Sequence, residues 1–221
     1  MSRQHEHEHE FEAAPGLPEK LPAGEHILWQ GAPEWRSLGV SAFGLRTVAM
    51  YLLVMWLLQF AHLWDQGSSA REMAKYLGIS GACATLAWGF LGGFIYLVSS
   101  TTLYTLTNRR VVMRIGVVLG LTLNLPYRQI TGASLKPLAR GTGDLAVQIK
   151  PDSHIAYLHL WPHARPWHFK APQPTLRSIP GAEAVSGILL QAWRLENPSE
   201  RMLAGEAAPA PAMAPNHGLM A

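Results

Sequence analysis

The chain has 221 residues, of which 48% are hydrophobic and 15% are charged. Soluble domains average about 25% charged residues, so this composition argues against a single soluble domain and against a largely disordered chain. It indicates instead that part of the chain lies in lipid. The single cysteine, Cys83, excludes an intramolecular disulfide framework and a multi-cysteine metal site.

The net charge of +3 is distributed unevenly along the chain. Lys and Arg counted against Asp and Glu give −3 for residues 1–46, 0 for 47–98, +7 for 99–196 and −1 for 197–221. The acidic head contains the sequence HEHEHE, which either binds a divalent metal loosely or forms a solvated terminus. We expect residues 1–45 to form a partly disordered N-terminal cytoplasmic segment, and the Ala- and Pro-rich residues 197–221 to form a disordered tail.

Two long segments carry no charge. Residues 47–64 read TVAMYLLVMWLLQFAHLW, and residues 77–98 read LGISGACATLAWGFLGGFIYLV. A helix needs about 20 apolar residues to cross the core of a bilayer, and helices satisfy their own backbone groups in lipid. The alternative is a buried helical hairpin of a soluble protein, which two segments of this length disfavour. We therefore expect a transmembrane helical hairpin over residues 46–98.

The basic residues around this hairpin predict its orientation. Two of them, Arg71 and Lys75, lie in the connecting loop. Five lie on the outer flanks, namely Arg36, Arg46, Arg109, Arg110 and Arg114. Because cytoplasmic flanks carry the excess of Lys and Arg, both termini are expected in the cytoplasm.

Residues 99–196 show the pattern of a small β domain. Leucines at every second position of residues 119–125, and apolar residues at every second position of residues 145–149, give the period of half-buried strands. Further strand candidates are residues 104–107, 111–115, 130–135 and 155–161, with a turn at residues 141–144. The close spacing of the strands favours an antiparallel meander.

One amphipathic helix follows the strands. Pro180 suits its first turn, and Asn197-Pro198 ends it. Val185, Leu189 and Trp193 fall on one apolar face at helical spacing. The expected fold is thus an α+β membrane protein, a two-helix hairpin followed by an antiparallel β-barrel capped by an α-helix.

The basic region resembles the bacterial PH-like domain over the stretches TLYTLTNRRVVMRIGVV and LNLPYRQITGASLKPLARGTGDLAVQI. Members of that family show a Tyr-x-x-Thr-x-x-Arg run, here Tyr104, Thr107 and Arg110. They also show a Gly-x-Gly hairpin, here Gly141 and Gly143, and such domains often sit beside membrane helices.

Residues 15–35, PGLPEKLPAGEHILWQGAPEW, closely resemble the start of the PuhB family of photosynthetic complex assembly proteins of purple bacteria. The order of the later regions also follows that family. The resemblance implies a non-catalytic role in assembling the photosynthetic reaction centre and its light-harvesting 1 antenna, whose subunits would be the partners. It further implies a location in the inner, intracytoplasmic photosynthetic membrane. It implies no set of functional residues.

Two features of the apolar segments are candidate sites. Gly89 and Gly93 have GxxxG spacing, which lets membrane helices approach closely. They can pack against the first helix, pair two copies in a homodimer, or dock a partner helix. His62 lies near the loop-side end of the first helix, where it either holds a bacteriochlorophyll or stays hydrated at the headgroup level.

The basic region offers further candidates. Arg109, Arg110 and Arg114 are expected to contact anionic lipid or an acidic partner. Trp161 and Trp167 lie in the histidine-rich stretch HIAYLHLWPHARPWHF, which suits either an interface with lipid or a partner, or a metal or pigment site. The alternative function class is a membrane-tethered PH-like module that binds lipid or protein without an assembly role.

Catalysis and nucleic-acid binding are not expected. The sequence contains no Walker loop, GxSxG elbow or HExxH motif. It also contains no RNP-like motif or recognition helix. We therefore expect a binding protein without an enzymatic reaction.

Overall fold

The computed structural model describes residues 17, 21–117, 120–150 and 155–197. The predictions for the HEHEHE head and for the tail after Asn197 fall outside these residues.

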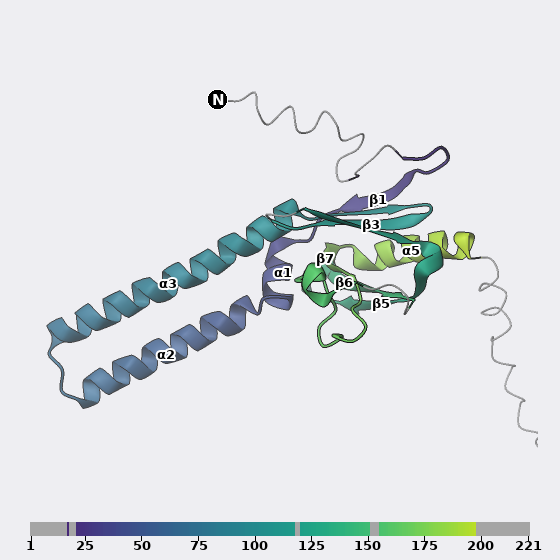
Figure 1. Cartoon of the computed structure of the whole chain (residues 1–221). Coiled ribbons are helices and arrows are strands. Elements are labelled where there is room, and N and C mark those ends of the chain that lie inside the picture. Colours follow the sequence, from purple (N-terminus) through teal and green to yellow (C-terminus); the bar gives the residue numbers. More distant parts are fainter. Residues whose placement is uncertain (1–16, 18–20, 118–119, 151–154, 198–221) are drawn as a thin grey trace, which may run out of the picture.

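Two long helices form a hairpin that projects from the rest of the molecule (Figure 1). They are α2 (Leu45–Asp65) and α3 (Ala70–Thr101). Both are long and apolar enough to cross a membrane, and only 6% and 11% of their most apolar windows are buried in the structure. Each helix extends beyond the uncharged segment that predicts it.

The early start of α3 has a local cause. The Ser69 side chain accepts a hydrogen bond from the backbone N–H of Glu72, while the Glu72 carboxylate accepts one from the backbone N–H of Ser69. This capping box satisfies the free N–H groups of the first turn. The helix therefore begins at Ala70, seven residues before the apolar segment that starts at Leu77.

A short helix joins the hairpin to the remaining domain. This helix, α1 (Trp35–Ser41), begins where the Glu34 carboxylate accepts hydrogen bonds from the N–H groups of Arg36 and Ser37. Its Leu38 is fully buried in a small cluster with Ile95 and Val98 near the end of α3. We expected this region to belong to a partly disordered segment, whereas in the structure it forms helix α1.

Seven strands, counted within the described residues, form two antiparallel sheets. The first sheet has the order β1 (Ile27–Gly31), β2 (Leu103–Thr107), β3 (Arg110–Ile115) and β4 (Leu121–Pro126). The second has the order β5 (Ile130–Pro137), β6 (Thr142–Ile149) and β7 (Thr175–Pro180). The prediction of an antiparallel β-barrel capped by a helix is thus confirmed in part: within the described residues the strands are antiparallel, but no ladder joins the two sheets into one barrel.

The first strand reaches its partner across the whole hairpin. Gln30 of β1 pairs with Thr105 of β2, although α1, α2 and α3 separate the two strands in the chain. The helices are thus inserted between the first and second strands of the domain. The sheet therefore includes β1, which precedes the β region expected at residues 99–196.

The second sheet differs from the predicted pattern at three places. Residues 155–161, expected as a strand, contain the short helix α4 (Tyr157–Leu160) instead. Strand β7 was not expected, because its residues are buried on both faces and show no alternation. The turn lies at residues 138–141, before Gly143, because Arg140 and Gly141 adopt positive φ angles there.

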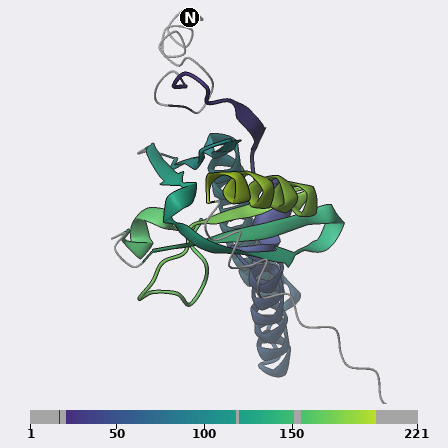
Figure 2. The same ribbon diagram turned by 90° about the vertical axis from the view of Figure 1, so that its right-hand side faces the viewer.

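The predicted C-terminal helix is confirmed as α5 (Ala182–Glu196). The helix lies across the strands (Figure 2). It contacts β1, β5 and β6, and its apolar residues join the main core, so it covers the space between the two sheets. Trp193 donates a hydrogen bond from Nε1 to the carbonyl of Ile130 at 2.9 Å. Pro180 was expected in the first turn of this helix, but it is the last residue of β7. The helix itself begins one residue after Gly181.

Candidate functional site

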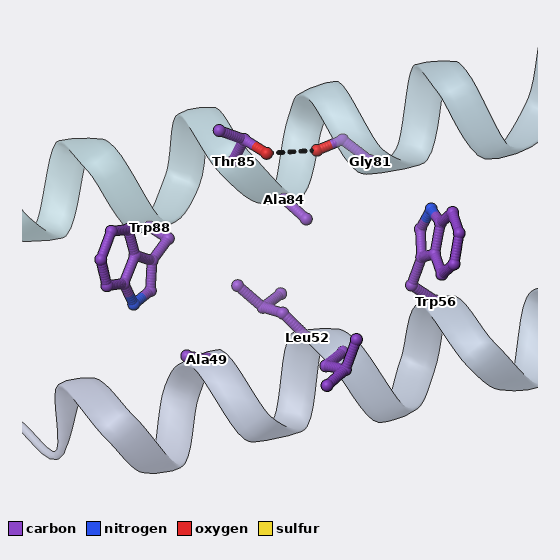
Figure 3. A pocket seen from close by; sticks show the side chains of 8 residues that line it. Ala49, Leu52, Trp56, Gly81, Ala84, Thr85 and Trp88 are labelled. Carbon is purple, nitrogen blue, oxygen red and sulfur yellow. Dashed lines mark hydrogen bonds between the residues drawn. The ribbon is translucent and has the colours of Figure 1, made fainter.

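A groove lies between the two long helices, with tryptophans at both ends (Figure 3). Its volume is about 280 Å³, and apolar side chains such as Leu52 form most of its wall. Trp56 donates from Nε1 to the carbonyl of Leu77 at 3.1 Å, and Trp88 donates from Nε1 to the carbonyl of Leu45 at 3.3 Å. The two indoles thus tie α2 to α3 and hold the groove open between them.

The glycines of α3 face different surroundings. A Cβ at Gly81 would lie 3.2 Å from Nε1 of Trp56, whereas a Cβ at Gly89 or Gly93 would meet no atom within 4 Å. Of the three roles considered for Gly89 and Gly93, packing against the first helix is therefore not seen in the structure, and contact with a partner helix stays a prediction. Gly81 makes the close approach, and the GxxxG pair faces outward, where it is open to a second helix.

His62 is exposed in the last turn of α2. One of its ring nitrogens, Nε2, lies 3.0 Å from Nε2 of Gln66. The groove between the helices does not include this side chain. Pigment binding at His62 stays a prediction, since the structure brings no second ligand or cavity wall to it.

The end of α3 is joined to the sheets by a buried chain of hydrogen bonds. Thr102 donates from Oγ1 to the carbonyl of Val98 at 2.7 Å, and Oγ1 lies 3.2 Å from Nε2 of His163. Nδ1 of His163 lies 2.7 Å from the Tyr104 hydroxyl, which also accepts from the N–H of Arg177 at 3.2 Å. Because each hydroxyl has one proton, His163 must donate from Nε2 and accept at Nδ1.

Burial determines the protonation states of His163 and Tyr104 in this hydrogen-bond network. Burial, the larger cause, and the nearby positive charge of Arg177 together lower the pKa of His163 from the ordinary 6.5 to about 3. Burial likewise raises the pKa of the Tyr104 hydroxyl. Both groups are therefore neutral near neutral pH, as the hydrogen-bond directions require.

A buried ion pair continues the junction toward α1. Asp144 accepts a hydrogen bond from the N–H of Ser178 at 2.8 Å, and its second oxygen lies 3.6 Å from Nη1 of Arg177. The carbonyl of Ser178 accepts from the N–H of Glu34, and its hydroxyl lies 3.0 Å from that of Ser41. The residue before α1 and the end of that helix are thus both fixed to β7.

The three candidate arginines after α3 have different surroundings. Arg109 is exposed, while Arg110 is partly buried and forms a two-point ion pair with Glu25 at 2.7 and 3.0 Å. The Arg110 charge is therefore compensated inside the protein, which corrects its assignment to lipid or partner contact. Arg114 is partly buried and makes an interaction of its own in the structure.

The two candidate tryptophans lie on the surface in the connection between β6 and β7. Trp161 contacts the ring of Phe43 edge-on at 5.7 Å, next to the α1–α2 connection. Trp167 is 86% exposed and lies edge-on to Phe169. Of the four histidines in this stretch, His163 is buried, and His154 lies outside the described residues.

The described residues contain no group of three or more His, Cys, Asp or Glu side chains that could hold a metal ion. Sequence reasoning missed the polar junction around His163 and the partner of Arg110. Neither leaves a local signal, because the partners lie 59 and 85 residues apart in the chain.

Comparison with known families decides the classification. The model of the bacterial PH domain family matches residues 40–193. The chain belongs to the bacterial PH domain family. The match includes both long helices and strands β2 to β7, whereas β1 precedes it.

One curated relative is similar over most of the chain. An uncharacterized 23.7 kDa protein in the puhA 5′ region of Rhodobacter capsulatus is 36% identical over 188 residues, covering 85% of this chain and 88% of its own. No solved structure matches the chain. The PH domain assignment agrees with the two antiparallel sheets and the C-terminal helix α5.

Proposed function

We propose that this chain is a non-catalytic assembly factor for the photosynthetic reaction centre and its light-harvesting 1 antenna. In this proposal α2 and α3 cross the inner membrane of a purple bacterium, and both termini lie in the cytoplasm. The helix pair docks nascent membrane subunits, and the PH-like domain holds the membrane surface or the cytoplasmic face of a subunit.

The helix pair carries the assembly part of the proposal. Its apolar windows are almost wholly unburied, and Gly89 and Gly93 offer an open surface on α3. In lipid, exposed small residues allow close backbone contact with another helix, which is how membrane helices associate. The rigid junction around His163 would transmit the position of a docked helix to the cytoplasmic domain.

The photosynthetic part rests on similarity. The Rhodobacter capsulatus relative is described by its position beside puhA, and residues 15–35 resemble the PuhB family. The position of the relative and the resemblance of residues 15–35 are separate observations that both favour a photosynthetic role. They support a photosynthetic partner over an unrelated membrane protein.

Deletion of the gene tests the proposal directly. Membrane spectra should show less assembled reaction centre and antenna, while extracted bacteriochlorophyll shows that pigment synthesis continues. Unchanged levels of assembled complex in the deletion strain would overturn the proposal.

A complementation series tests the docking surface. Gly89→Leu with Gly93→Leu adds bulk to the outward face without a clash in the fold, since a Cβ at either position meets nothing within 4 Å. As a control, Ala87→Leu places a leucine at another exposed position of α3, although it adds less bulk than the double variant. The double variant should fail to restore assembly, and the control should restore it.

The second candidate function is a membrane-tethered module that binds anionic lipid or an acidic partner without an assembly role. The net charge of +7 over residues 99–196 favours it. Charge reversal at the exposed Arg109 separates the two functions, because Arg110 is needed for the ion pair with Glu25. Loss of membrane or partner binding with normal complex assembly would favour this candidate.

A further inference from the structure

A basic pocket lies where the helix pair meets the domain. It is formed by α1, the first turn of α2 and the turn between β5 and β6, and its volume is about 140 Å³. Three of its lining residues are arginines, Arg36, Arg46 and Arg140, one from each of these segments. A water in liquid occupies about 30 Å³, so the pocket has room for a group of several heavy atoms.

The three guanidinium groups form no ion pair with a carboxylate in the described part of the chain. Arg36 lies over the ring of Trp35 at 5.2 Å. The neighbouring carboxylate, that of Glu34, is occupied by the backbone N–H groups at the start of α1. The pocket therefore gathers positive charge that forms no ion pair with the described residues.

The start of α2 adds to this positive field. The helix follows Gly44, which has a φ of 61° and supplies no side-chain cap, and its first turn contains no acidic residue. Free N–H groups and the helix dipole make such an end positive, so Arg46 in the first turn is electrostatically unfavourable by itself. An anion in the pocket would stabilise both the helix end and the arginines.

We infer that this pocket binds the phosphate of an anionic phospholipid headgroup. The inference rests on the proposed membrane placement, in which the start of α2 lies at the level of the headgroups. Arginine forks match phosphate oxygens in two-point hydrogen bonds. Val40, 40% exposed, and Leu138 give the pocket an apolar edge beside the lipid, which a site for free phosphate does not need.

The test uses the purified full chain in detergent micelles that contain either phosphatidylglycerol or phosphatidylcholine. Native mass spectrometry counts the lipids retained on the protein. Phosphatidylglycerol should be retained about tenfold more strongly, equivalent to about 1.4 kcal/mol. Equal retention of the two lipids would overturn the inference, and so would displacement of phosphatidylglycerol by low millimolar inorganic phosphate.

Two sets of variants locate the site. Arg46→Gln with Arg140→Gly should abolish the preference, and glycine suits position 140 because its φ is 61°. The control, Arg109→Gln with Arg128→Gln, removes two exposed arginines elsewhere and should keep the preference. Arg140→Gly alone should weaken it if the double variant does not fold.

The outcomes are independent of the assembly role. A preference retained by the pocket variant, or lost in the control, overturns the lipid site and leaves assembly by the helix pair intact. Conversely, a deletion strain with normal reaction centres overturns the assembly role and leaves the lipid measurement standing.

Discussion

The Tyr104 hydroxyl and Nδ1 of His163 lie 2.7 Å apart in a fully buried contact between β2 and the segment that precedes β7. In this bond the tyrosine must donate and the histidine must accept. The reason is that the Thr102 hydroxyl donates its proton to the carbonyl of Val98, so Nε2 of His163 has to carry the proton that it donates to Thr102. The neutral imidazole thus connects Thr102 at the end of α3 to Tyr104 of β2, and the Tyr104 hydroxyl in turn accepts from the N–H of Arg177 of β7 in the second sheet.

The stability of the protein should fall as the pH falls below about 6.5. The folded pKa of His163 is about 3 against an ordinary 6.5, so between these values the unfolded chain binds more protons than the folded one. Stability is then lost by up to about 1.4 kcal/mol per pH unit as the pH falls through this window. Thermal unfolding of the full chain in micelles from pH 8 to pH 4 measures it.

Two variants isolate the histidine contribution. His163→Gln keeps a neutral donor and acceptor and should flatten the pH dependence. His168→Gln changes a histidine whose Nδ1 contacts only the carbonyl of Pro166 nearby, and should leave the dependence unchanged. Equal slopes for wild type and His163→Gln would contradict the assignment.

Removing the Arg110 side chain should destabilise the fold. Its partner, the Glu25 side chain, is 2% exposed, so Arg110→Gln leaves a buried carboxylate without its cation. Because the guanidinium is partly exposed, we expect a loss of about 1–3 kcal/mol, below the range for fully buried pairs. The neighbouring Arg109→Gln should change stability by less than about 0.5 kcal/mol. Chemical denaturation of both variants provides the comparison.

Leucine substitutions at two glycines of α3 should affect the stability of the hairpin differently. Gly81→Leu places a side chain against the indole of Trp56 and should separate the helices, since the Cβ alone would lie 3.2 Å from Nε1. We expect a cost of about 1–3 kcal/mol, as for other overpacked contacts. Gly89→Leu meets open space and should leave the thermal midpoint in micelles unchanged or higher. A midpoint lowered equally by both would refute the close approach at Gly81.

Gly143 and Gly187 offer a second matched pair. A Cβ at Gly143 would lie 2.6 Å from the Cβ of Ala182 and 3.1 Å from the carbonyl oxygen of Lys136, so Gly143→Ala should displace α5 from the sheet. Gly187→Ala meets nothing within 4 Å in the middle of α5 and should stabilise it by about 0.5–1 kcal/mol. Unfolding midpoints that shift in opposite directions would confirm both.

Some of these positions could be anticipated from composition and period, and others could not. Alternating leucines located β4, and the apolar face of Val185 and Leu189 located α5, because burial on one side leaves a local pattern. Strand β7 has no such pattern, since its charged residue Arg177 is also buried, where it pairs with the distant Asp144. GxxxG spacing singled out Gly89 and Gly93 but left three neighbours open, because spacing defines a face of the helix and not what lies against it.

The sequence by itself determined the two long helices, the basic β region and the C-terminal helix. Length, lack of charge and residue period are local properties, and each requires a particular backbone form to satisfy its hydrogen bonds and bury its apolar side chains. Only the tertiary structure decided that β1 joins β2 across the hairpin, that Glu25 compensates Arg110, and that His163 is buried and neutral. These depend on residues far apart in the chain, whose electrostatic and packing partners exist only after folding.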